Sequence, residues 1–529
     1  MANKTLFKNT PGETMPPTDT VNAENAPAYK MSPEATLAQF AATGCFNGVF
    51  YTSAEDLLEK VLEACKGVST EFVAKTAIWS RRESLMKDMP AFLVAWLTKQ
   101  NGALAERVFF QVIDNPKMLR NFVQILRSGV VGRKSLGSRP KKLILKWLAS
   151  RTPEAIFKGS VGNDPSMSDI IKMVHPKPDT DERRALYAYL TGRLDSSKVR
   201  EGAPTPTAEA LPALVQAFEA WKKSKAGAPP NVPFEMLTAL DLGTPEWTEI
   251  ARNASWTQTR MNLNTFKRHG VFKDAAMVKL VAERLVDAAL IRKSKVFPYQ
   301  IFAAYKHVEG VPREIENALQ DAAEVAIENV PEIPGKVWIF VDVSGSMKSP
   351  VTGHRIGSTS KVMCLEAAAV FAAAILRKNQ TADVIPFHSE VVKFRPNPRD
   401  PVMTTAQKLA GLPSGGTSIS APLAHLNRLK EQGDLLVYVS DNQSWADAGA
   451  HAHGTTTMQE WAKFKIANPK AKMVCIDLQP YADTQAQESS DILNIGGFSD
   501  ACFDVIAAFA KGQGGAQHWV DAIQAVRLG

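Results

Sequence analysis

The stretch Lys336-Val-Trp-Ile-Phe-Val-Asp-Val-Ser-Gly-Ser346 indicates the fold of the C-terminal part of this chain. Its five consecutive apolar residues, 337–341, predict a strand buried on both faces, as in a parallel sheet. Asp342, Ser344 and Ser346 follow at alternate positions and predict a loop with one carboxylate and two hydroxyls on the same side. Such an all-oxygen ligand set suits a hard cation, and we expect Mg²⁺.

Two later segments offer further ligands for the same cation. Ser414-Gly-Gly-Thr417 precedes a helix pattern, and Asp434-Leu-Leu-Val-Tyr-Val-Ser-Asp441 is a second apolar strand that ends in an acid. Open parallel sheets bind ligands beside the carboxyl ends of their strands. The predicted ligands are therefore Asp342, Ser344, Ser346, Thr417 and Asp441, a set that resembles the metal-ion-dependent adhesion site of von Willebrand factor A domains. The alternative is that Asp342 and the serines only cap the next helix.

Length and composition limit the classes of protein to consider. A chain of 529 residues is too long for one ordinary domain, and 45% hydrophobic content is typical of a folded protein. The sequence contains no apolar run of 18 residues and no apolar signal core near Met1, so neither a membrane span nor secretion is expected. The five cysteines form no CxxC pair, which predicts reduced thiols in a cytoplasmic protein and no zinc site.

Four segments are expected along the chain. Residues 1–30 are polar and predict an extended arm, whereas 31–333 read as many short amphipathic helices, including one at 280–291, and predict an α-solenoid of paired helices. Strands and helices alternate over 334–498, with strands expected at 336–342, 381–387, 391–394, 434–440 and 471–477. This alternation predicts an α/β doubly wound parallel sheet. Residues 499–529 predict two helices that pack on either domain.

Basic residues are concentrated in one segment. The net charge of +8 is modest, yet no acid occurs between Asp114 and Glu154, where there are ten bases. Arg133 and Lys134 lie in a Gly-containing loop, and the following helix aligns Arg139, Lys142 and Lys146 opposite an apolar face. Such a ridge favours phosphate contacts, although most charge runs are ordinary solvated surfaces.

Two further segments bear on nucleic-acid binding. The helix that begins near Met167 ends at His175 before two prolines and carries Lys172 close to that end. Residues 256–268 interleave Trp256 with Arg260, Lys267 and other polar residues, a mixture that can stack on bases and hold phosphates. The alternative for the second segment is an ordinary connection between helices.

Several motifs together resemble one family. They are Arg127-Ser-Gly129, Gly132-Arg-Lys-Ser-Leu-Gly137, Ser168-Asp-Ile-Ile-Lys-Met-Val-His-Pro-Lys-Pro178, Ile291-Arg-Lys-Ser-Lys-Val-Phe-Pro298, Asp342-Val-Ser-Gly-Ser-Met347, Ser440-Asp-Asn-Gln-Ser-Trp445 and Asp491-Ile-Leu-Asn-Ile-Gly-Gly-Phe-Ser-Asp500. Because these motifs occur in the family's order, the chain resembles the Ro ribonucleoprotein autoantigen family, whose helical module is the TROVE domain. Within that family it resembles the bacterial Ro-related branch.

The resemblance implies both a fold and a function. The fold would be a multidomain one: an all-α ring of HEAT-like helical repeats, followed by a von Willebrand A domain that closes it. The ring would bind small noncoding Y-like RNA on its outer basic surface and single-stranded 3′ ends of misfolded or precursor RNA in its central hole. An exoribonuclease such as polynucleotide phosphorylase is an implied partner. Lys158 and His175 match RNA-contacting positions of the family, whereas Gly162 stands where the family has a base, so that contact is missing or is supplied by a neighbour such as Lys172.

We therefore expect a cytoplasmic, monomeric RNA-binding protein in RNA quality control. No catalytic residue is expected, because the sequence shows no nucleophile with a neighbouring base, no P-loop and no two-metal carboxylate cluster. The alternatives are a metal-dependent protein-interaction module whose basic surface is incidental, and a metal-dependent hydrolase. The predicted RNA-binding residues are Arg127, Arg133, Lys134, Arg139, Lys141, Lys142, Lys146, Lys158, Lys172 and His175.

Overall fold

The computed structural model describes residues 17–43, 53–84, 86–194, 205–353, 360–444, 446, 454–479, 481, 483–497, 501–512 and 518–529. The chain forms two compact units. The first takes in residues 1–64, 297–299 and 327–521, and the second takes in residues 65–296, 300–326 and 522–529. The predicted fold class, a helical region followed by a doubly wound α/β domain, is confirmed.

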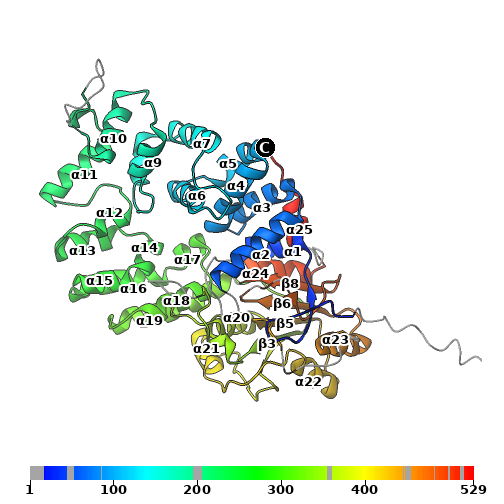
Figure 1. Cartoon of the computed structure of the whole chain (residues 1–529). Coiled ribbons are helices and arrows are strands. Elements are labelled where there is room, and N and C mark those ends of the chain that lie inside the picture. The colour runs from blue at the N-terminus through cyan, green and yellow to red at the C-terminus, as the bar shows by residue number, and fades with distance from the viewer. Residues whose placement is uncertain are drawn as a thin grey trace, which may run out of the picture. The chain divides into compact units, whose positions relative to one another are not determined.

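A five-stranded sheet is the centre of the first unit (Figure 1). Its strands are β3 (Val337–Asp342), β4 (Ala382–Phe387), β5 (Leu435–Ser440), β6 (Lys472–Asp477) and β8 (Ile492–Gly496). Their order is β4-β3-β5-β6-β8, and every neighbouring pair is parallel. Because β4 lies on one side of β3 and β5 on the other, the winding direction reverses between β3 and β5. Parallel sheets bind ligands at such a reversal.

Helices cover both faces of this sheet. On one face α22 (Ala421–Leu429) and α23 (Thr456–Ala467) pack on alternate strand residues, and the buried cluster includes Phe340, Tyr438 and Trp461. On the other face α20 (Cys364–Lys378) packs on β3, and its Phe371 stacks on Phe503 of α24 (Ala501–Ala510) with ring centroids 4.6 Å apart. The helix α21 (Val402–Ala410) packs against α20.

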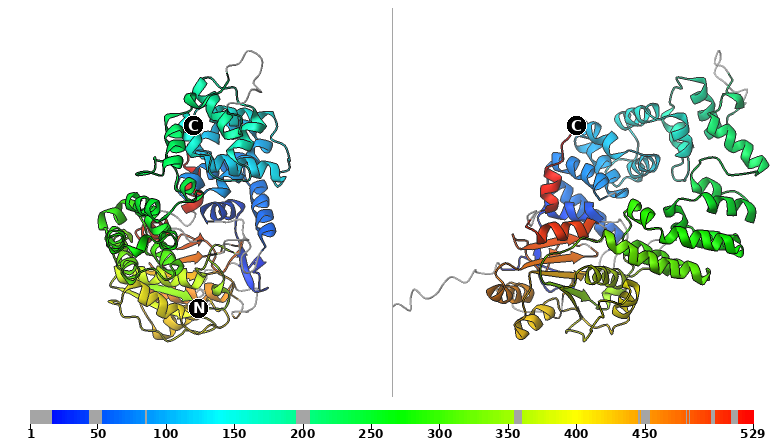
Figure 2. Two further views of the ribbon diagram at one scale, coloured as in Figure 1. Left: turned by 90° about the vertical axis from the view of Figure 1, so that its left-hand side faces the viewer. Right: turned by 180° about the vertical axis from the view of Figure 1, so that it is seen from behind.

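The second unit consists of helices that pack mainly on their neighbours in sequence, as in helical repeats (Figure 2). The helices are α3 (Thr70–Arg82), α4 (Asp88–Gln100), α5 (Gly102–Val112), α6 (Pro116–Ser128), α7 (Ser138–Ala149), α8 (Pro153–Lys158), α9 (Met167–Val174), α10 (Asp181–Thr191), α11 (Ala213–Ser224), α12 (Phe234–Thr238), α13 (Thr244–Asn253), α14 (Trp256–Met261), α15 (Leu263–Arg268), α16 (Ala275–Val286), α17 (Ala288–Ser294), α18 (Pro298–His307) and α19 (Arg313–Ala326). The closed ring that the resemblance implies stays a prediction.

Polar caps delimit many of these helices. Asn115 accepts a hydrogen bond from Met118 N at 3.0 Å, and Pro116 begins α6 with its backbone angle already helical. Ser166 and Asp169 form a reciprocal capping box at the start of α9. His175 ends α9 in the left-handed conformation, with φ of 52°, before the two prolines, as the sequence predicted.

Two predictions within the domains are wrong. The helix expected at 280–291 is interrupted by Asp287, whose extended backbone ends α16 and whose side chain caps α17 by accepting from Leu290 N. A strand at 391–394 does not form, because only Val391 pairs, in an isolated bridge with Phe387. The strand β8 and the helix α21 were not expected, since neither segment follows the simple alternation of apolar runs.

The N-terminal segment is more ordered than an extended arm. Residues Thr20–Val21 (β1) and Pro27–Lys30 (β2) form an antiparallel sheet with Asp483–Thr484 (β7), and α1 (Pro33–Thr43) packs near β8. Together with part of α2 (Ala54–Gly67), this segment belongs to the first compact unit. Residues 1–16 of the predicted arm lie outside the described residues.

The predicted C-terminal helices correspond to α24 and to α25 (His518–Gln524). Residues 498–500 and 513–517 of that prediction, Cys45 and Trp445 also lie outside the described residues. Among the helices of the described part, none is both long and apolar enough to cross a membrane.

Candidate functional site

The loop after β3 holds three of the predicted metal ligands close together. Asp342 is fully buried, and its Oδ1 accepts a hydrogen bond from Ser344 N at 2.8 Å. The hydroxyls of Ser344 and Ser346 lie 3.2 Å apart. The other carboxylate oxygen of Asp342 accepts from the Ser440 hydroxyl at 2.6 Å, so this aspartate links the ends of β3 and β5. Ser440 was not anticipated, although its place at a strand end was visible in the sequence.

The loop that carries Thr417 reaches the same place. Gly345 N donates a hydrogen bond to Gly415 O at 3.2 Å, which joins the two loops. A Cβ at Gly415 would lie 2.8 Å from the His388 ring, so only glycine fits this approach. Thr417 is buried, and its carbonyl accepts from the Ser444 hydroxyl at 3.3 Å. The loops after β3 and β5 and the 414–417 loop therefore meet at the reversal point of the sheet.

Asp441 is the most unusual group of this site. Its side chain is buried, and neither carboxylate oxygen has a hydrogen-bond partner among the described residues. Burial, followed by the negative charge of Asp342, raises the pKa of Asp441 to about 7. The nearby Ser346 hydroxyl and Gln443 N–H oppose this rise in pKa, but neither reaches hydrogen-bond geometry. Burying an unpaired carboxylate costs several kcal/mol, and a bound divalent cation would offset this cost.

Neighbouring acids add to this negative potential. Burial raises the pKa of Asp342, while hydrogen bonds from Ser440 and Ser344 oppose that rise. Asp477, at the end of β6, has a pKa raised well above its usual range by burial and by the charge of Asp441. Its carboxylate accepts from Gln479 N at 3.2 Å and from Tyr481 N at 3.4 Å. Asp477 is thus held by its own loop and was missed as part of this acidic group.

The carboxylate and hydroxyl oxygens of this site suit a hard cation. Within the described part of the chain no group of three or more His, Cys, Asp or Glu side chains has the arrangement of a metal site. A cation here would therefore be bound by two carboxylates and by Ser and Thr hydroxyls, which suits Mg²⁺. The alternative role, capping of the next helix, is not supported, because the turn Ser346–Lys348 begins at Gly345 without a side-chain cap.

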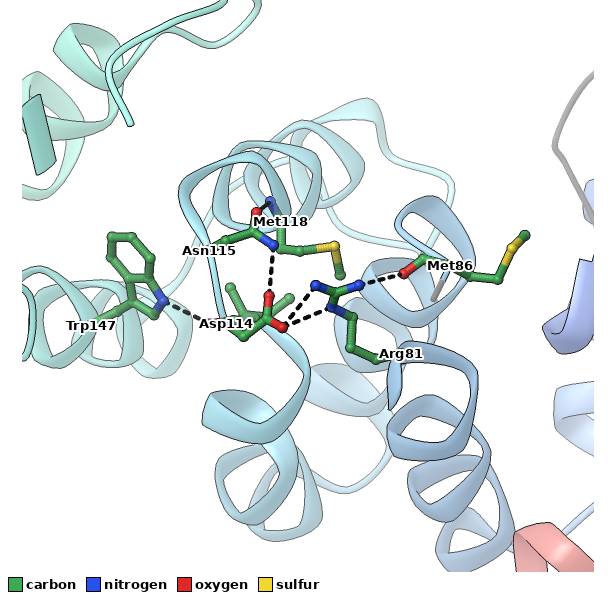
Figure 3. A network of polar contacts seen from close by, with 7 residues as sticks. Arg81, Met86, Asp114, Asn115, Met118 and Trp147 are labelled. Atoms are coloured by element: carbon green, nitrogen blue, oxygen red, sulfur yellow. Dashed lines mark hydrogen bonds and ion pairs between the residues drawn. The ribbon is translucent and has the colours of Figure 1, made fainter. Parts of the chain in front are cut away.

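The basic helix α7 has the two faces that the sequence predicted. Leu143, Ile144, Trp147 and Leu148 are buried, whereas Arg139, Lys142 and Lys146 are exposed. The Trp147 Nε1–H donates to Ile113 O at 2.7 Å and anchors α7 to the end of α5 (Figure 3). The helix is thus fixed on its apolar side and presents its cations to solvent.

The last acid before the basic segment is already neutralised. Asp114 forms an ion pair with Arg81 at 2.8 Å and also accepts from Asn115 Nδ2 at 2.7 Å, and Arg81 reaches Met86 O as well (Figure 3). The carboxylate of Asp114 is therefore engaged on the α3 side of the fold. Its contacts with Arg81 and Asn115 engage Asp114 outside the basic segment.

Three of the predicted RNA-binding residues surround one hollow. A cavity of about 530 Å³ opens where α7 begins. Its lining residues are Thr98, Glu106, Arg133, Gly137, Ser138, Arg139, Pro140 and Lys142. Arg139 pairs with Glu106 of α5 at 3.1 Å, and both side chains are half exposed. The acid-free segment thus receives one acid from elsewhere in the fold, and sequence order could not reveal that acid.

The other predicted residues are distributed over neighbouring helices. Lys134 is exposed and Lys141 is half buried. Arg127 of α6 and Lys172 of α9 both lie near Asp169; its pKa is lowered first by hydrogen bonds from Ser166 and then by these two cations. Lys158 ends α8, which packs mainly on α10, and His175 is the exposed final cap of α9.

Sequence reasoning missed Arg120 beside the expected gap at Gly162. A Cβ at Gly162 would lie 2.6 Å from the Arg120 guanidinium. One buried Nη of Arg120 has no hydrogen-bond partner in the described structure, and burial lowers the pKa of this side chain. The α6 cation Arg120 therefore lies next to position 162.

The 256–268 segment follows the simpler of its two interpretations. Trp256 is buried, and its Nε1–H donates to Leu285 O at 3.1 Å, so its ring is not available for base stacking. Arg260 donates to Gln300 O and Asn264 to His307 O. These residues connect helices, so the suggestion that Trp256 stacks on bases is wrong, whereas phosphate contacts of the exposed Lys267 stay a prediction.

The fold and the loops after β3 and β5 define a protein with a helical-repeat region and a von Willebrand A-type domain. Residues 336–510 match a family model described as the Ro60 vWA domain. A relative from Deinococcus radiodurans, "RNA-binding protein RO60", is 25% identical over 523 residues, which cover 92% of this chain and 94% of the relative. The crystal structure of the Deinococcus radiodurans RO (RSR) protein shares the fold, with a TM-score of 0.63, 21% identity and coverage of 91% of this chain and 100% of that one.

These likenesses confirm the resemblance that the motifs indicated. The chain is similar to a Ro relative over most of its length, and residues 336–510 match the Ro60 vWA domain.

Proposed function

We propose that this chain is an RNA-binding ribonucleoprotein component that acts as a scaffold in RNA quality control and processing. In this proposal a Y-like RNA binds the outer basic surface of a helical ring, and single-stranded 3′ ends of misfolded or immature RNA enter its central hole. The protein would be a cytoplasmic monomer without catalytic activity of its own, and an exoribonuclease such as polynucleotide phosphorylase would degrade or trim the bound RNA. The name of its Deinococcus relative as an RNA-binding protein supports the choice of ligand.

One observation carries the proposal. Arg133, Arg139 and Lys142 surround the cavity at the start of α7, within a segment that has no acid between Asp114 and Glu154. Phosphate oxygens are the natural ligands of such a surface, and contacts of this kind bind RNA without reading its sequence. The buried free cysteines Cys65, Cys364, Cys475 and Cys502 support a reducing, cytoplasmic compartment.

We further propose that Asp342, Ser344, Ser346, Thr417 and Asp441 hold one divalent cation, with Mg²⁺ as the expected ion. The unpartnered oxygens of Asp441 support this assignment. A cation bound there would neutralise the paired aspartates and could accept a carboxylate from a partner at an open coordination position.

The same observation favours a second candidate function. If a partner carboxylate completes the cation site, the chain acts as a metal-dependent protein-interaction module. That function and RNA binding can coexist. The cation loops (residues 342–346, 414–417 and 441–444) and the basic surface (the ten predicted RNA-binding residues) belong to different compact units.

A charge-reversal experiment tests RNA binding. The variant Lys142→Glu, Lys146→Glu, Lys158→Glu should weaken binding of a structured noncoding RNA and reduce the slope of log affinity against log salt by about one unit for each lost phosphate contact. A control with the same charge change carries Lys223→Glu, Lys279→Glu and Lys463→Glu, at exposed positions outside the basic segment. Unchanged affinity in the first variant, or equal loss in both, would contradict the proposed surface.

A further inference from the structure

We propose that residues 20–30 form an N-terminal clamp that positions Asp441 for cation binding, and that Asn22 is its principal positioning residue. The inference rests on the cation site proposed above. It extends that site to a segment more than 400 residues away in the sequence, which the ligand motif does not include.

The conformation of the loop at 441–444 depends on contacts with other segments of the chain. Because the carboxylate of Asp441 has no hydrogen-bond partner among the described residues, the backbone of this loop sets its direction. Asn442 is buried and adopts a left-handed conformation with φ of 61°, which is uncommon for a residue other than glycine. Such a conformation persists only where surrounding contacts fix it.

The clamp supplies two of these contacts directly. Asn22 Nδ2 donates to Ser444 O at 2.6 Å, and Ala23 N donates to Gln443 Oε1 at 2.9 Å. Asn22 is only 4% exposed, and its Oδ1 accepts from Glu24 N and Ala26 N, both at 3.0 Å. One side chain therefore shapes the turn between β1 and β2 and also holds the Asp441 loop.

The clamp holds the other side of the loop through β7. Asn442 Nδ2 donates to Thr484 Oγ1 at 3.2 Å, and Gln443 Nε2 donates to Asp483 Oδ1 at 3.4 Å. Both acceptors belong to β7, which pairs with β2 through Tyr29 opposite Thr484 and Lys30 opposite Asp483. Residues 442–444 are thus fixed between the β1–β2 turn and a strand that the clamp itself pairs with.

Loss of this support should lower cation affinity without removing a ligand. Groups that orient metal ligands contribute 10–100-fold to affinity when they are substituted. The variant Asn22→Asp is a sharp test, because it keeps the Oδ1 acceptor of the turn and removes the donor to Ser444 O. The variant Asn22→Ala removes the same donor without adding a charge, so a similar loss in both variants would assign the effect to the lost hydrogen bond and not to the new charge.

The experiment measures Mn²⁺ binding to the full-length chain by calorimetry and by paramagnetic resonance. We expect about 10-fold weaker binding for Asn22→Asp and for Asn22→Ala, with circular dichroism spectra like that of the wild type. The matched control is Asp19→Ala, which removes the contact of Asp19 Oδ1 with Lys30 N, at 2.7 Å, and no contact with the loop. Its Mn²⁺ affinity should stay within twofold of the wild type.

Different results would overturn different parts of this assignment. Wild-type protein that fails to bind Mn²⁺ would refute the cation site and the clamp together. Tight binding by the wild type and unchanged affinity in both Asn22 variants would refute the clamp alone. An equal loss in Asp19→Ala would show that general loosening of the segment, and not Asn22, lowers the affinity.

Discussion

The cation loops and the basic surface differ in solvent exposure, and therefore in how their residues bind a ligand. All five predicted cation ligands are at most 5% exposed, whereas none of the ten predicted RNA-binding side chains is buried. A buried polar site depends on a few atoms, since each unpaired group there has a large desolvation cost. An exposed basic surface acts through many weak, salt-screened contacts. Single substitutions should therefore have large effects in the first region and small, cumulative effects in the second.

The largest expected effect is on cation binding. Asp441→Ala removes a ligand and should lower Mn²⁺ affinity by more than about 100-fold, because even residues that only orient ligands contribute up to that amount. The RNA affinity of the same variant should not change, since the basic surface lies in the other compact unit. Calorimetry and filter binding on the same preparations would measure both affinities.

The control for this variant is Asp383→Ala, which removes an exposed acid of β4 that pairs with Lys336. It should leave Mn²⁺ binding unchanged. A loss of RNA affinity in Asp441→Ala that matches its loss of Mn²⁺ affinity would show that the two regions do not act separately.

An intermediate effect is expected at Gly162, where the resemblance to the Ro family implies a base. Restoring a base with Gly162→Lys should not improve RNA binding. The residue has φ of 100°, where a side chain costs about 1–3 kcal/mol, and its Cβ would displace the Arg120 guanidinium. We expect a lower melting temperature and weaker RNA binding, measured by thermal unfolding and by salt-titrated binding.

Arg120→Ala is the companion to that variant. If Arg120 supplies the cation next to position 162, its loss should weaken RNA binding by an amount similar to that of Gly162→Lys. Stronger RNA binding by Gly162→Lys than by the wild type would contradict the role assigned to Arg120.

The sequence was most informative where structure is local. Apolar runs that end in Asp342 and Asp441 predicted β3, β5 and the cation loops, because a strand and the spacing of the ligands after it are local sequence patterns. The two faces of α7 followed from its three- and four-residue spacing in the same way. Asp287 broke the expected helix at 280–291 because capping by its side chain outweighed the apolar period.

Contacts between distant segments could not be predicted in this way. Asn22 meets Ser444, Arg120 lies beside Gly162, and Glu106 pairs with Arg139, yet no local pattern marks any of these pairs. Each depends on how helices or strands pack in three dimensions. The ligand motif is a local pattern and could be recognised in the sequence. The residues that support it come from distant segments and could not.

The smallest expected effect concerns the acid that fold packing brings to the basic surface. Glu106→Gln should raise RNA affinity by about twofold, because the half-exposed pair with Arg139 contributes at most about 1 kcal/mol and its loss frees Arg139 for phosphate. The gain should shrink as salt rises and should vanish when Arg139→Ala is present as well. The variant Glu283→Gln, at an exposed acid of α16 that pairs with Lys279, provides the control and should leave affinity unchanged. An equal gain in that control would mean that total charge, and not the local pair beside the cavity, governs RNA binding.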